Sequence, residues 1–381
     1  MCLKNFFTLT IILFAFKNSF AQSYPIFGPE IKVTINGLSF DAMEPFISLD
    51  ENIMFFNSLN STDTTNLYYA TRINDSIFNY VGPVLGIIDT AANHLDAVAS
   101  IDISNNFYWT SLHDFPLVPE TLLRGVYSGG SITDTSKVYG NFNVYLPGWL
   151  IMDAAINYDG NILSYTNAFF DSCMFGAPCI ATIGLANKVN DSLFNKLPNT
   201  DALFTYINDT NYICYAPQLT LDGLEMYYTR LLKNTVNTEI CVSVRDTPTD
   251  TFSSPMVIHS NLNFTPEAAT PTSDKQKIYY HQRNSLSVFE LYLRYRTGTV
   301  GIEKTEQKNK LKIYPNPASN FLNVEIPAKG LLKIFDISGK VVFSKDIIPG
   351  TQFIELNLTK GPYILELSSK DEVYRGKIVV K

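Results

Sequence analysis

The sequence predicts an all-β protein, and three observations support that prediction. Between residues 22 and 297, short alternating runs of Tyr, Phe, Thr, Ile and Val are broken by Asp, Asn and Gly, which is the composition of strands and turns. One phrase recurs in this region at intervals of 52 to 63 residues. Residues 311–381 form a second, shorter strand pattern. We therefore expect a repeat domain followed by a small C-terminal β-sandwich domain.

Residues 1–21 have the pattern of a signal peptide. Lys4 supplies a positive charge, residues 6–16 are apolar, and Ser19-Phe20-Ala21 offers small residues where a signal peptidase cuts. We expect cleavage after Ala21 and Sec-dependent passage into the periplasm. The apolar run is shorter than the roughly 20 residues of a transmembrane helix. No other run reaches that length, so no transmembrane segment is predicted.

The recurring phrase is a small-residue strand that closes on an aspartate and precedes an aromatic strand. Residues 219–223, Leu-Thr-Leu-Asp-Gly, followed by Tyr227-Tyr228, are a clear copy. A repeat of this length in a β-rich chain indicates one four-stranded sheet per repeat, stacked radially as the blades of a β-propeller. Gly160 and Gly223 suit the positive φ of the first hairpin turn. The closing aspartates are Asp50, Asp102, Asp159, Asp222 and Asp274.

The fifth repeat lacks an outer strand of its own, because the chain becomes polar after Arg296. Residues 24–31 precede the first repeat and resemble residues 78–85, the outer strand of that repeat. An N-terminal strand that completed the last sheet would close the ring and cover both exposed edges. We therefore predict a five-bladed β-propeller over residues 22–297, closed by an N-terminal strand.

The charge is divided unevenly along the chain. Residues 22–297 carry 14 Lys and Arg against 27 Asp and Glu, a net charge of −13, whereas residues 311–381 carry 10 against 7. An acidic repeat domain repels phosphate backbones, so nucleic acid is not expected as a partner. Cations, neutral glycans and basic proteins stay open. Residues 298–310, rich in Lys and Glu, are expected to be a solvated linker.

Residues 311–381 contain several motifs in a fixed order. Pro-Asn-Pro comes first, then an Asp-Ile-Ser-Gly-Lys turn, a Gly-x-Tyr strand and a last strand that ends on lysine. Together they resemble the type A C-terminal sorting domain of the type IX secretion system of Bacteroidetes. The resemblance implies recognition by the type IX machinery, passage across the outer membrane, and removal of the tail with release or surface attachment. The motif residues are Pro315, Asn316, Pro317, Gly339, Gly361, Tyr363, Lys377 and Lys381.

The repeat phrase, Pro-x-x-Ser/Thr-x-Asp-Gly before an aromatic strand, resembles the WD40-like or TolB-type propeller repeat. The fourth repeat fits it well, while the first, second and fifth lack the glycine. Proteins with this repeat bind partners more often than they catalyse. The expected function is therefore that of a secreted or cell-surface binding module for a glycan or a protein. A glycoside hydrolase-like enzyme and a structural surface protein are the alternatives, since five-bladed propellers also include glycosidases.

Carboxylates recur where the inner strand of a repeat begins. If the blades are equivalent, these side chains converge at one mouth of the central channel. Three interpretations stay open: bonds to backbone amides at a strand start, binding of a cation or another ligand, or glycoside chemistry at the channel mouth. No catalytic residue, metal ligand or cofactor is assigned. The four positions are Glu44, Asp96, Asp153 and, displaced by one residue, Glu267.

Cys173 and Cys179 bracket a short loop of the third repeat. In an exported protein such a loop is expected to close as a disulfide, and the spacing is not the Cys-x-x-Cys of a metal site. Cys214 and Cys241 fall on predicted strands around the fourth repeat. Either a second disulfide or two buried thiols fits these positions.

Tyrosine pairs recur at residues 68–69, 227–228 and 279–280. Strand aromatics that repeat in register favour packing between blades over a sugar-binding platform. His94 lies two residues before Asp96 and suits either a loop or the channel mouth.

Overall fold

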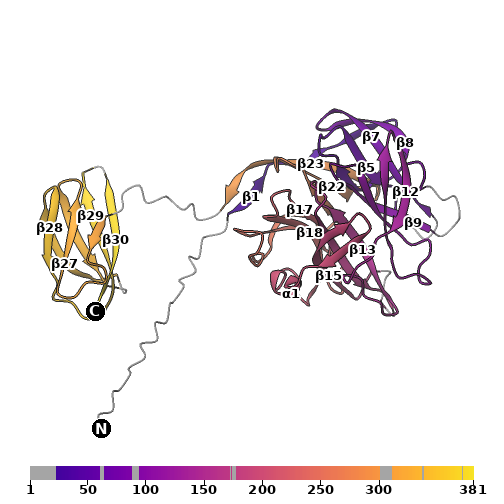
Figure 1. Ribbon diagram of the computed structural model, residues 1–381. Helices are drawn as coiled ribbons and strands as arrows, with labels where there is room; N and C mark the ends of the chain where they lie inside the picture. Colours follow the sequence, from indigo (N-terminus) through magenta and orange to yellow (C-terminus); the bar gives the residue numbers. More distant parts are fainter. Residues whose placement is uncertain are drawn as a thin grey trace, which may run out of the picture. The chain divides into compact units, whose positions relative to one another are not determined.

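The structure is a computed structural model, and its described residues form thirty strands and one four-residue helix, α1 (Thr200–Leu203). The predicted all-β class is confirmed. The chain divides into two compact units, residues 1–302 and 303–381 (Figure 1). The expected signal peptide lies outside the described residues. The residues that the structure describes are 23–60, 64–87, 94–171, 173, 177–300, 311–336, 339–370 and 372–381.

The first unit contains, in its described part, five sheets whose successive strands are antiparallel neighbours. Two short strands, β3 (Thr34–Asn36) and β6 (Thr64–Thr65), add parallel pairs to the first and second sheets. From the first strand outward, the sheets are as follows. Sheet 1 is β4 (Met43–Ile47), β5 (Ile53–Asn57), β7 (Leu67–Asn74) and β8 (Ile77–Pro83); sheet 2 is β9 (His94–Ile101), β10 (Asn106–Ser111), β11 (Leu122–Ser128) and β12 (Ser131–Lys137); sheet 3 is β13 (Trp149–Ile156), β14 (Ile162–Phe169), β15 (Ile180–Asn190) and β16 (Leu193–Lys196); sheet 4 is β17 (Tyr212–Leu219), β18 (Glu225–Leu232), β19 (Thr238–Val244) and β20 (Met256–Ser260); sheet 5 begins with β21 (Glu267–Pro271), β22 (Lys277–Arg283) and β23 (Phe289–Val300).

The closing aspartates of the five repeats form the same turn between the first and second strands. In each, the carboxylate Oδ1 accepts a hydrogen bond of 2.8 to 3.1 Å from the backbone N–H two residues later. In three repeats a hydroxyl two residues earlier, on Ser48, Thr220 or Thr272, donates to the same aspartate. These bonds reverse the chain. The recurring Ser/Thr-x-Asp is therefore a signal of the fold and not of a binding site.

Adjacent aromatic residues on the second strands pack toward opposite sides of each sheet, because successive strand residues point to opposite faces. Tyr227 packs with residues of sheet 5 and Tyr228 with residues of sheet 3. Tyr279 and Tyr280 pack against sheets 1 and 4 in the same way. All four side chains are fully buried. Packing between sheets is thus confirmed for these two pairs, and they are not available as a sugar platform.

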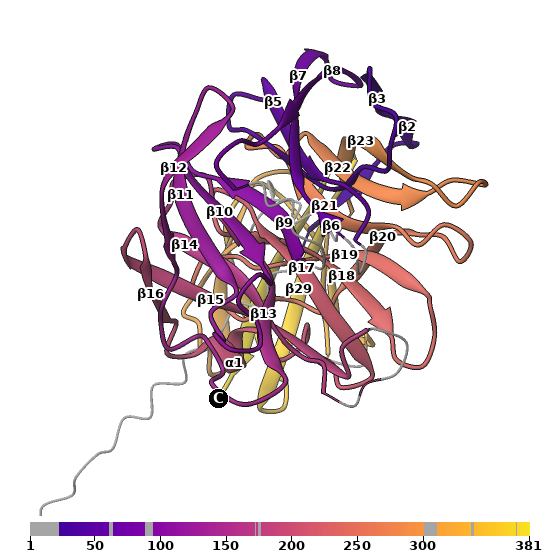
Figure 2. The ribbon, with the colours of Figure 1, turned by 90° about the vertical axis from the view of Figure 1, so that its right-hand side faces the viewer.

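Each sheet packs on two others, and the fifth packs on the first. Buried clusters lie between sheets 1 and 2, 2 and 3, 3 and 4, 4 and 5, and 5 and 1. The first strands of the sheets also contact one another in this order: β4 contacts β9, β9 contacts β13, β13 contacts β17, β17 contacts β21, and β21 contacts β4. In Figure 2 the labelled first strands β9, β13, β17 and β21 lie near one another, and the other strands of their sheets lie farther out. We call these five strands the inner strands and the line that they enclose the axis.

The N-terminal segment pairs with the last sheet. β1 (Tyr24–Phe27) runs antiparallel to residues 296–300 of β23, and β2 (Ile31–Lys32) pairs with residues 292–293. The polar residues at the end of β23 pair with β1, and β23 therefore continues to Val300. The expectation that the linker begins at Gly298 is therefore wrong, and the remaining linker residues, 301–310, lie outside the described part of the chain.

Tyr158 fills the axis on the side of the aspartate turns. It follows β13, and its hydroxyl lies 3.0 Å from the carbonyl oxygen of Ile47 and 3.1 Å from that of Pro271, to which it can donate in turn. The side chain is buried and packs on Phe46. One phenol from sheet 3 thus joins the inner strands of sheets 1 and 5 across the centre.

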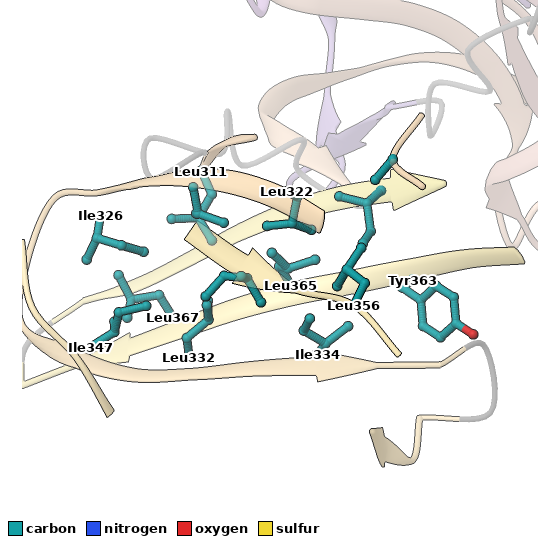
Figure 3. Packing of buried hydrophobic residues seen from close by; sticks show 14 of the residues in the cluster. Leu311, Leu322, Ile326, Leu332, Ile334, Ile347, Leu356, Tyr363, Leu365 and Leu367 are labelled. Carbon is teal, nitrogen blue, oxygen red and sulfur yellow. The ribbon is translucent and has the colours of Figure 1, made fainter. Parts of the chain in front are cut away.

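The second unit consists of two antiparallel sheets around one apolar core (Figure 3). Buried and exposed residues alternate along β25, β29 and β30, as expected for strands with one face toward a core. One sheet is β24 (Lys312–Tyr314), β25 (Phe321–Ile326) and β28 (Gly350–Glu355); the other is β27 (Val341–Ile347), β26 (Gly330–Phe335), β29 (Gly361–Ser369) and β30 (Val373–Val380).

Asn316 of the Pro-Asn-Pro motif fastens the start of this unit to its last strand. Its amide nitrogen donates to the Lys377 carbonyl at 2.9 Å, and its amide oxygen accepts the Val379 N–H at 3.0 Å. The Lys381 N–H donates to the Ala318 carbonyl at 2.9 Å. Tyr363 donates from its hydroxyl to a backbone carbonyl. The two ends of the motif are therefore joined in space.

The structure contains the disulfide between Cys173 and Cys179, with sulfur atoms 2.05 Å apart. Cys214 and Cys241 are buried free thiols. They lie on β17 and β19, which are separated by β18, so their Cα atoms are roughly 10 Å apart at the usual strand spacing. A disulfide needs less than about 7 Å, and the second pairing left open by the sequence is excluded.

Candidate functional site

Three of the four recurring carboxylates lie near one another on three of the inner strands. Glu44 lies on β4, Asp153 on β13 and Glu267 on β21. The Glu44 carboxylate interacts electrostatically with those of both Asp153 and Glu267. We call these three residues the acidic cluster. Since the inner strands run from these acids toward the aspartate turns, the cluster lies at the end of the axis opposite Tyr158.

A bulge in each inner strand shapes the backbone around the cluster. Four residues at these bulges adopt a positive φ between 51° and 56° without being glycine, a strained conformation that persists only where its surroundings hold it. Each donates its N–H to a side chain of a neighbouring sheet. The pairs are Glu44 with His281 Nδ1 at 3.0 Å, Val98 with Asn57 Oδ1 at 3.4 Å, Ala216 with Asp153 Oδ2 at 2.9 Å, and Ala268 with Thr229 Oγ1 at 2.9 Å.

His281 stands directly beside the acidic cluster and is fully buried. Its Nδ1 accepts the Glu44 N–H, so the neutral ring carries its proton on Nε2. The nearest acceptor to Nε2 is Glu267 Oε2 at 3.7 Å, which is too long for a hydrogen bond, and Nε2 has no other partner among the described residues. Burial lowers the pKa of His281 to about 3, so the ring is neutral at neutral pH.

The carboxylates of the cluster hold their protons more tightly than exposed acids do. Burial raises the pKa of Glu267 to about 7, and the Asp153 charge adds to the rise against a hydrogen bond from Tyr215. Burial also raises the pKa of Glu44, with further contributions from Asp153 and Glu267, and it raises the pKa of Asp153. The three groups therefore share protons at neutral pH.

Glu267→Gln is expected to stabilise the first unit at pH 8 and to change its stability little at pH 4. A raised pKa means that the folded state binds more protons than the unfolded state between about pH 4.5 and pH 7, so stability falls as pH rises through this window. The gain at pH 8 should be roughly 1–2 kcal/mol. Urea unfolding followed by tryptophan fluorescence measures it, since Trp109 and Trp149 both lie in this unit.

Asp246→Asn, at an exposed position of the same unit, is the control and should change stability equally little at both pH values. A loss of stability in Glu267→Gln at pH 8 would mean that the charged carboxylate is favourable in the folded protein, contrary to the burial argument.

A small void lies on the axis at the acidic cluster. Residues from all five inner strands line it, and its volume is about 10 Å³, which is room for about one water molecule. Among the described residues, no group of three or more His, Cys, Asp and Glu side chains is arranged to hold a metal ion. The lining includes Glu44, Val98, Asp153, Ala216, Gln218, Ala268 and Thr270.

Asp96 does not join the cluster. Asp96 pairs with Ser111 of its second strand, whereas Asp153 and Glu267 pair with second-strand residues that lie one position earlier in their repeats. Because successive strand residues point to opposite faces, the Asp96 side chain points to the other face of its sheet. Its Oδ1 accepts the Trp109 indole N–H at 3.0 Å. It lines a separate cavity of about 290 Å³ beside His113. The expectation that all four acids converge is therefore wrong for Asp96.

The side chain of His94 lies outside the described part of the structure. The sequence interpretation missed His281 and Tyr215 as neighbours of the acids. A signal for His281 does exist, because a polar residue directly follows the aromatic residue of the second strand at Asn57, Thr166, Thr229 and His281. An alignment of the repeats at this polar position predicts that His281 lies beside the acidic cluster.

Residues 312–381 match the family described as the secretion system C-terminal sorting domain. The match confirms the type IX sorting domain predicted for this region and indicates export to the cell surface or secretion. It does not extend into the first unit. A search of curated proteins finds no match to the chain.

Several solved structures are similar to this chain at low identity. A family 117 glycoside hydrolase of Zobellia galactanivorans aligns over 71% of this chain and 90% of its own, with a TM-score of 0.47 and 9% identity. An endo-arabinase from Bacteroides thetaiotaomicron aligns over 69% and 96%, with a TM-score of 0.45 and 14% identity. PorZ, a surface component of the type IX secretion system of Porphyromonas gingivalis, aligns over 91% and 52%, with a TM-score of 0.33 and 11% identity. None of these likenesses assigns an activity to this chain.

Within the described residues, no helix has the length and apolar character to cross a membrane.

Proposed function

We propose that the chain is an exported, non-enzymatic binding protein whose first unit is a five-bladed β-propeller that binds a glycan or a protein. The ligand binds on the face where the inner strands begin and the acidic cluster lies, which we call the mouth face. The observation that carries the proposal is the different chemistry of the two faces of this unit. The described loops of the mouth face include residues 112–121, 138–148, 197–211, 233–237, 261–266 and 284–288.

Apart from the longer connection at residues 245–255, the opposite face is built from short turns, which aspartate side chains and ion pairs stabilise. Lys275 pairs there with Asp222 at 2.6 Å, and Lys277 pairs with Glu51. The loops of the mouth face instead carry several strongly exposed apolar side chains, a feature of interaction surfaces. These include Leu117 at 92% exposure, Leu286 at 80%, Val236 at 72% and Leu262 at 70%, with Leu146, Tyr145 and Tyr206 also exposed.

Three observations support the closed five-bladed ring. Each neighbouring pair of sheets, including the fifth and the first, shares a buried cluster. The axial void is lined by all five inner strands. β1 and β2 complete the sheet that β21 begins. In this arrangement the N-terminal segment joins the two ends of the ring, and the sorting domain follows as a separate unit behind a linker.

The size of the axial void favours binding over glycoside chemistry. A glycosidase places two carboxyl groups about 5–9.5 Å apart on either side of a sugar. The void at Glu44 and Asp153 holds about 10 Å³, which does not admit a sugar ring. One carboxylate oxygen of Asp153 also has a structural role, because Oδ2 accepts the Ala216 N–H.

The test is to place charges on the apolar mouth-face residues. In a triple variant, Leu117→Glu, Leu262→Glu and Leu286→Glu, the mature chain should lose at least tenfold in affinity for its ligand, because apolar contacts at an interface centre dominate binding. Biolayer interferometry against immobilised polysaccharides and outer-membrane proteins measures the affinity. Ile103→Glu, an exposed apolar position on the opposite face, is the matched control.

Equal binding by the triple variant and the wild type would reject the mouth face as the binding surface. Release of reducing sugars from any polysaccharide, abolished by Glu44→Gln, would support the glycoside hydrolase alternative in place of the binding function.

A further inference from the structure

We propose that the cavity beside Asp96 binds a neutral saccharide. This inference rests on the proposed binding function and selects a glycan over a protein as the ligand. The cavity has a volume of about 290 Å³, and we call it the Asp96 cavity. Its lining includes Ser111, the last residue of β10, and His113 of the loop that follows. Because that loop, residues 112–121, belongs to the mouth face, the Asp96 cavity does too.

The strand register explains why the lining residues of sheet 2 share one face. Asp96 on β9 pairs with Ser111 on β10. Trp109, two residues before Ser111, pairs with Leu123 on β11, and Leu123 pairs with Lys137 on β12. Directly paired residues, and residues two apart on one strand, point to the same face of a sheet. All five side chains line the cavity, so four strands present one continuous row to it.

The floor of the Asp96 cavity is a buried carboxylate in a fixed orientation. Asp96 is only 5% exposed, and Trp109 and Ser111 are also buried. Aspartate is rarely buried to this extent unless it is hydrogen-bonded or paired. The indole N–H of Trp109 donates to Asp96 Oδ1 at 3.0 Å and so orients the carboxylate. A carboxylate has about four lone-pair sites, and it can therefore accept from more than one donor at once.

The rim of the cavity carries a charge pair and opens to solvent. Lys137 Nζ donates to Asp114 Oδ2 at 2.6 Å, and the Asp114 Oδ1 lies 3.0 Å from His113 Nδ1. The bond from Lys137 holds the pKa of Asp114 below its usual range, so both members of the pair are charged and offset each other. An ammonium group has three donors, and the bond to Asp114 uses one. His113 and Thr135 are exposed lining residues.

A sugar ring matches this combination of groups. Its hydroxyls both donate and accept, so they can donate to Asp96 at the floor and accept from Lys137 at the rim. Its C–H face can pack on the apolar side chains of Trp109 and Leu123, which lie between these two groups in the row. Pockets for drug-sized ligands have volumes of about 300–1,000 Å³, and the Asp96 cavity therefore suits a smaller ligand, such as one ring of a saccharide.

Other classes of small ligand fit the Asp96 cavity less well. An anion would approach the buried carboxylate of Asp96, and a cation would pass the ammonium group of Lys137. A purely apolar ligand would cover Asp96 without offering it a donor, which is costly for a polar group. A neutral molecule with several hydroxyls avoids all three penalties.

Trp109 provides a reporter inside the cavity. The chain contains two tryptophans, so Trp149→Phe leaves Trp109 as the only one. Because its indole lines the cavity and donates to Asp96, a bound ligand should change its fluorescence. The experiment titrates the full mature chain carrying Trp149→Phe with cellotriose, mannotriose, xylotriose and arabinotriose at neutral pH. We expect at least one of these trisaccharides to produce a saturable change.

Two variants of this chain test where the saccharide binds. Asp96→Asn should weaken binding at least tenfold, because a neutral acceptor replaces a charged one. Thr135→Tyr should weaken it as much, because a larger side chain at the exposed rim occupies the cavity and leaves the floor unchanged. Thr133→Tyr is the matched control, since Thr133 is exposed on the same strand and does not line the cavity. Urea unfolding midpoints check that each variant is folded.

Several outcomes would overturn the inference. Absence of a saturable change with all four trisaccharides at millimolar concentrations is one, and a change that Thr135→Tyr leaves intact is another. Tighter binding of a glucosamine trimer than of any neutral trisaccharide would assign the cavity to cations, and tighter binding of trigalacturonate would assign it to anions. A protein partner that depends on Leu262 and Leu286 but not on Asp96 or Thr135, in a chain that binds no saccharide, would overturn the saccharide site and leave the proposed binding function intact.

Discussion

A chain that ends at residue 310 is expected to accumulate in the periplasm and to be lost from the cell surface and the medium by at least tenfold. The removed part contains the sorting domain matched at residues 312–381, while the predicted signal peptide and the first unit stay intact. The physical reason is that the described residues of the second unit form a core of their own. Its removal should therefore abolish recognition without unfolding the remainder.

The measurement is cell fractionation and immunoblotting in a Bacteroidetes host with a working type IX system. The full-length chain is the positive control, and tryptophan fluorescence of the periplasmic product checks that the first unit is folded, since both tryptophans lie there. If the shortened chain reaches the medium as efficiently as the full-length chain, residues 311–381 are not its export signal.

A chain that starts at Met43 is expected to fold poorly or to aggregate. It lacks β1 and β2, which pair with β23, and so leaves one edge of the last sheet open to other chains. It also lacks Phe27 and Val33, both buried in clusters at the fifth sheet. Burial of two such side chains and the lost strand pairing together correspond to on the order of 5 kcal/mol, a large part of the usual stability of a domain.

Soluble yield, gel filtration and urea unfolding of the chain that starts at Met43 test this expectation. The matched control is the chain that starts at Gln22, which keeps every described N-terminal strand. A soluble monomer with the unfolding midpoint of the control would show that the N-terminal segment does not hold the ring together.

Tyr158 and the acidic cluster give the two ends of the axis different characters. On the side of the aspartate turns, a phenol packed on Phe46 occupies the centre. On the other side, Glu44 and Asp153 line a void of about 10 Å³. The axis therefore has one end filled by the chain itself and one end lined by buried acids.

Much of the fold follows from local patterns. Each closing aspartate stabilises its own turn by accepting a hydrogen bond from the N–H two residues later. The five repeats can therefore be recognised in the sequence without tertiary information. The aromatic pairs at residues 227–228 and 279–280 likewise follow from the two-residue period of a strand. The sorting motif is equally local in sequence, although the bond from Asn316 to the last strand is not.

The amino-acid sequence by itself determined the all-β class, the repeated strands and turns, the short disulfide loop and the sorting domain, because each depends on residues close together in the chain. Only the tertiary structure decided which acids meet. A strand turns its side chains alternately to opposite faces, so one residue of register separates Asp96, bonded to Trp109, from Asp153 and Glu267 at the axis. Bulges set that register, and the bonds that hold them come from neighbouring sheets, as His281 holds Glu44.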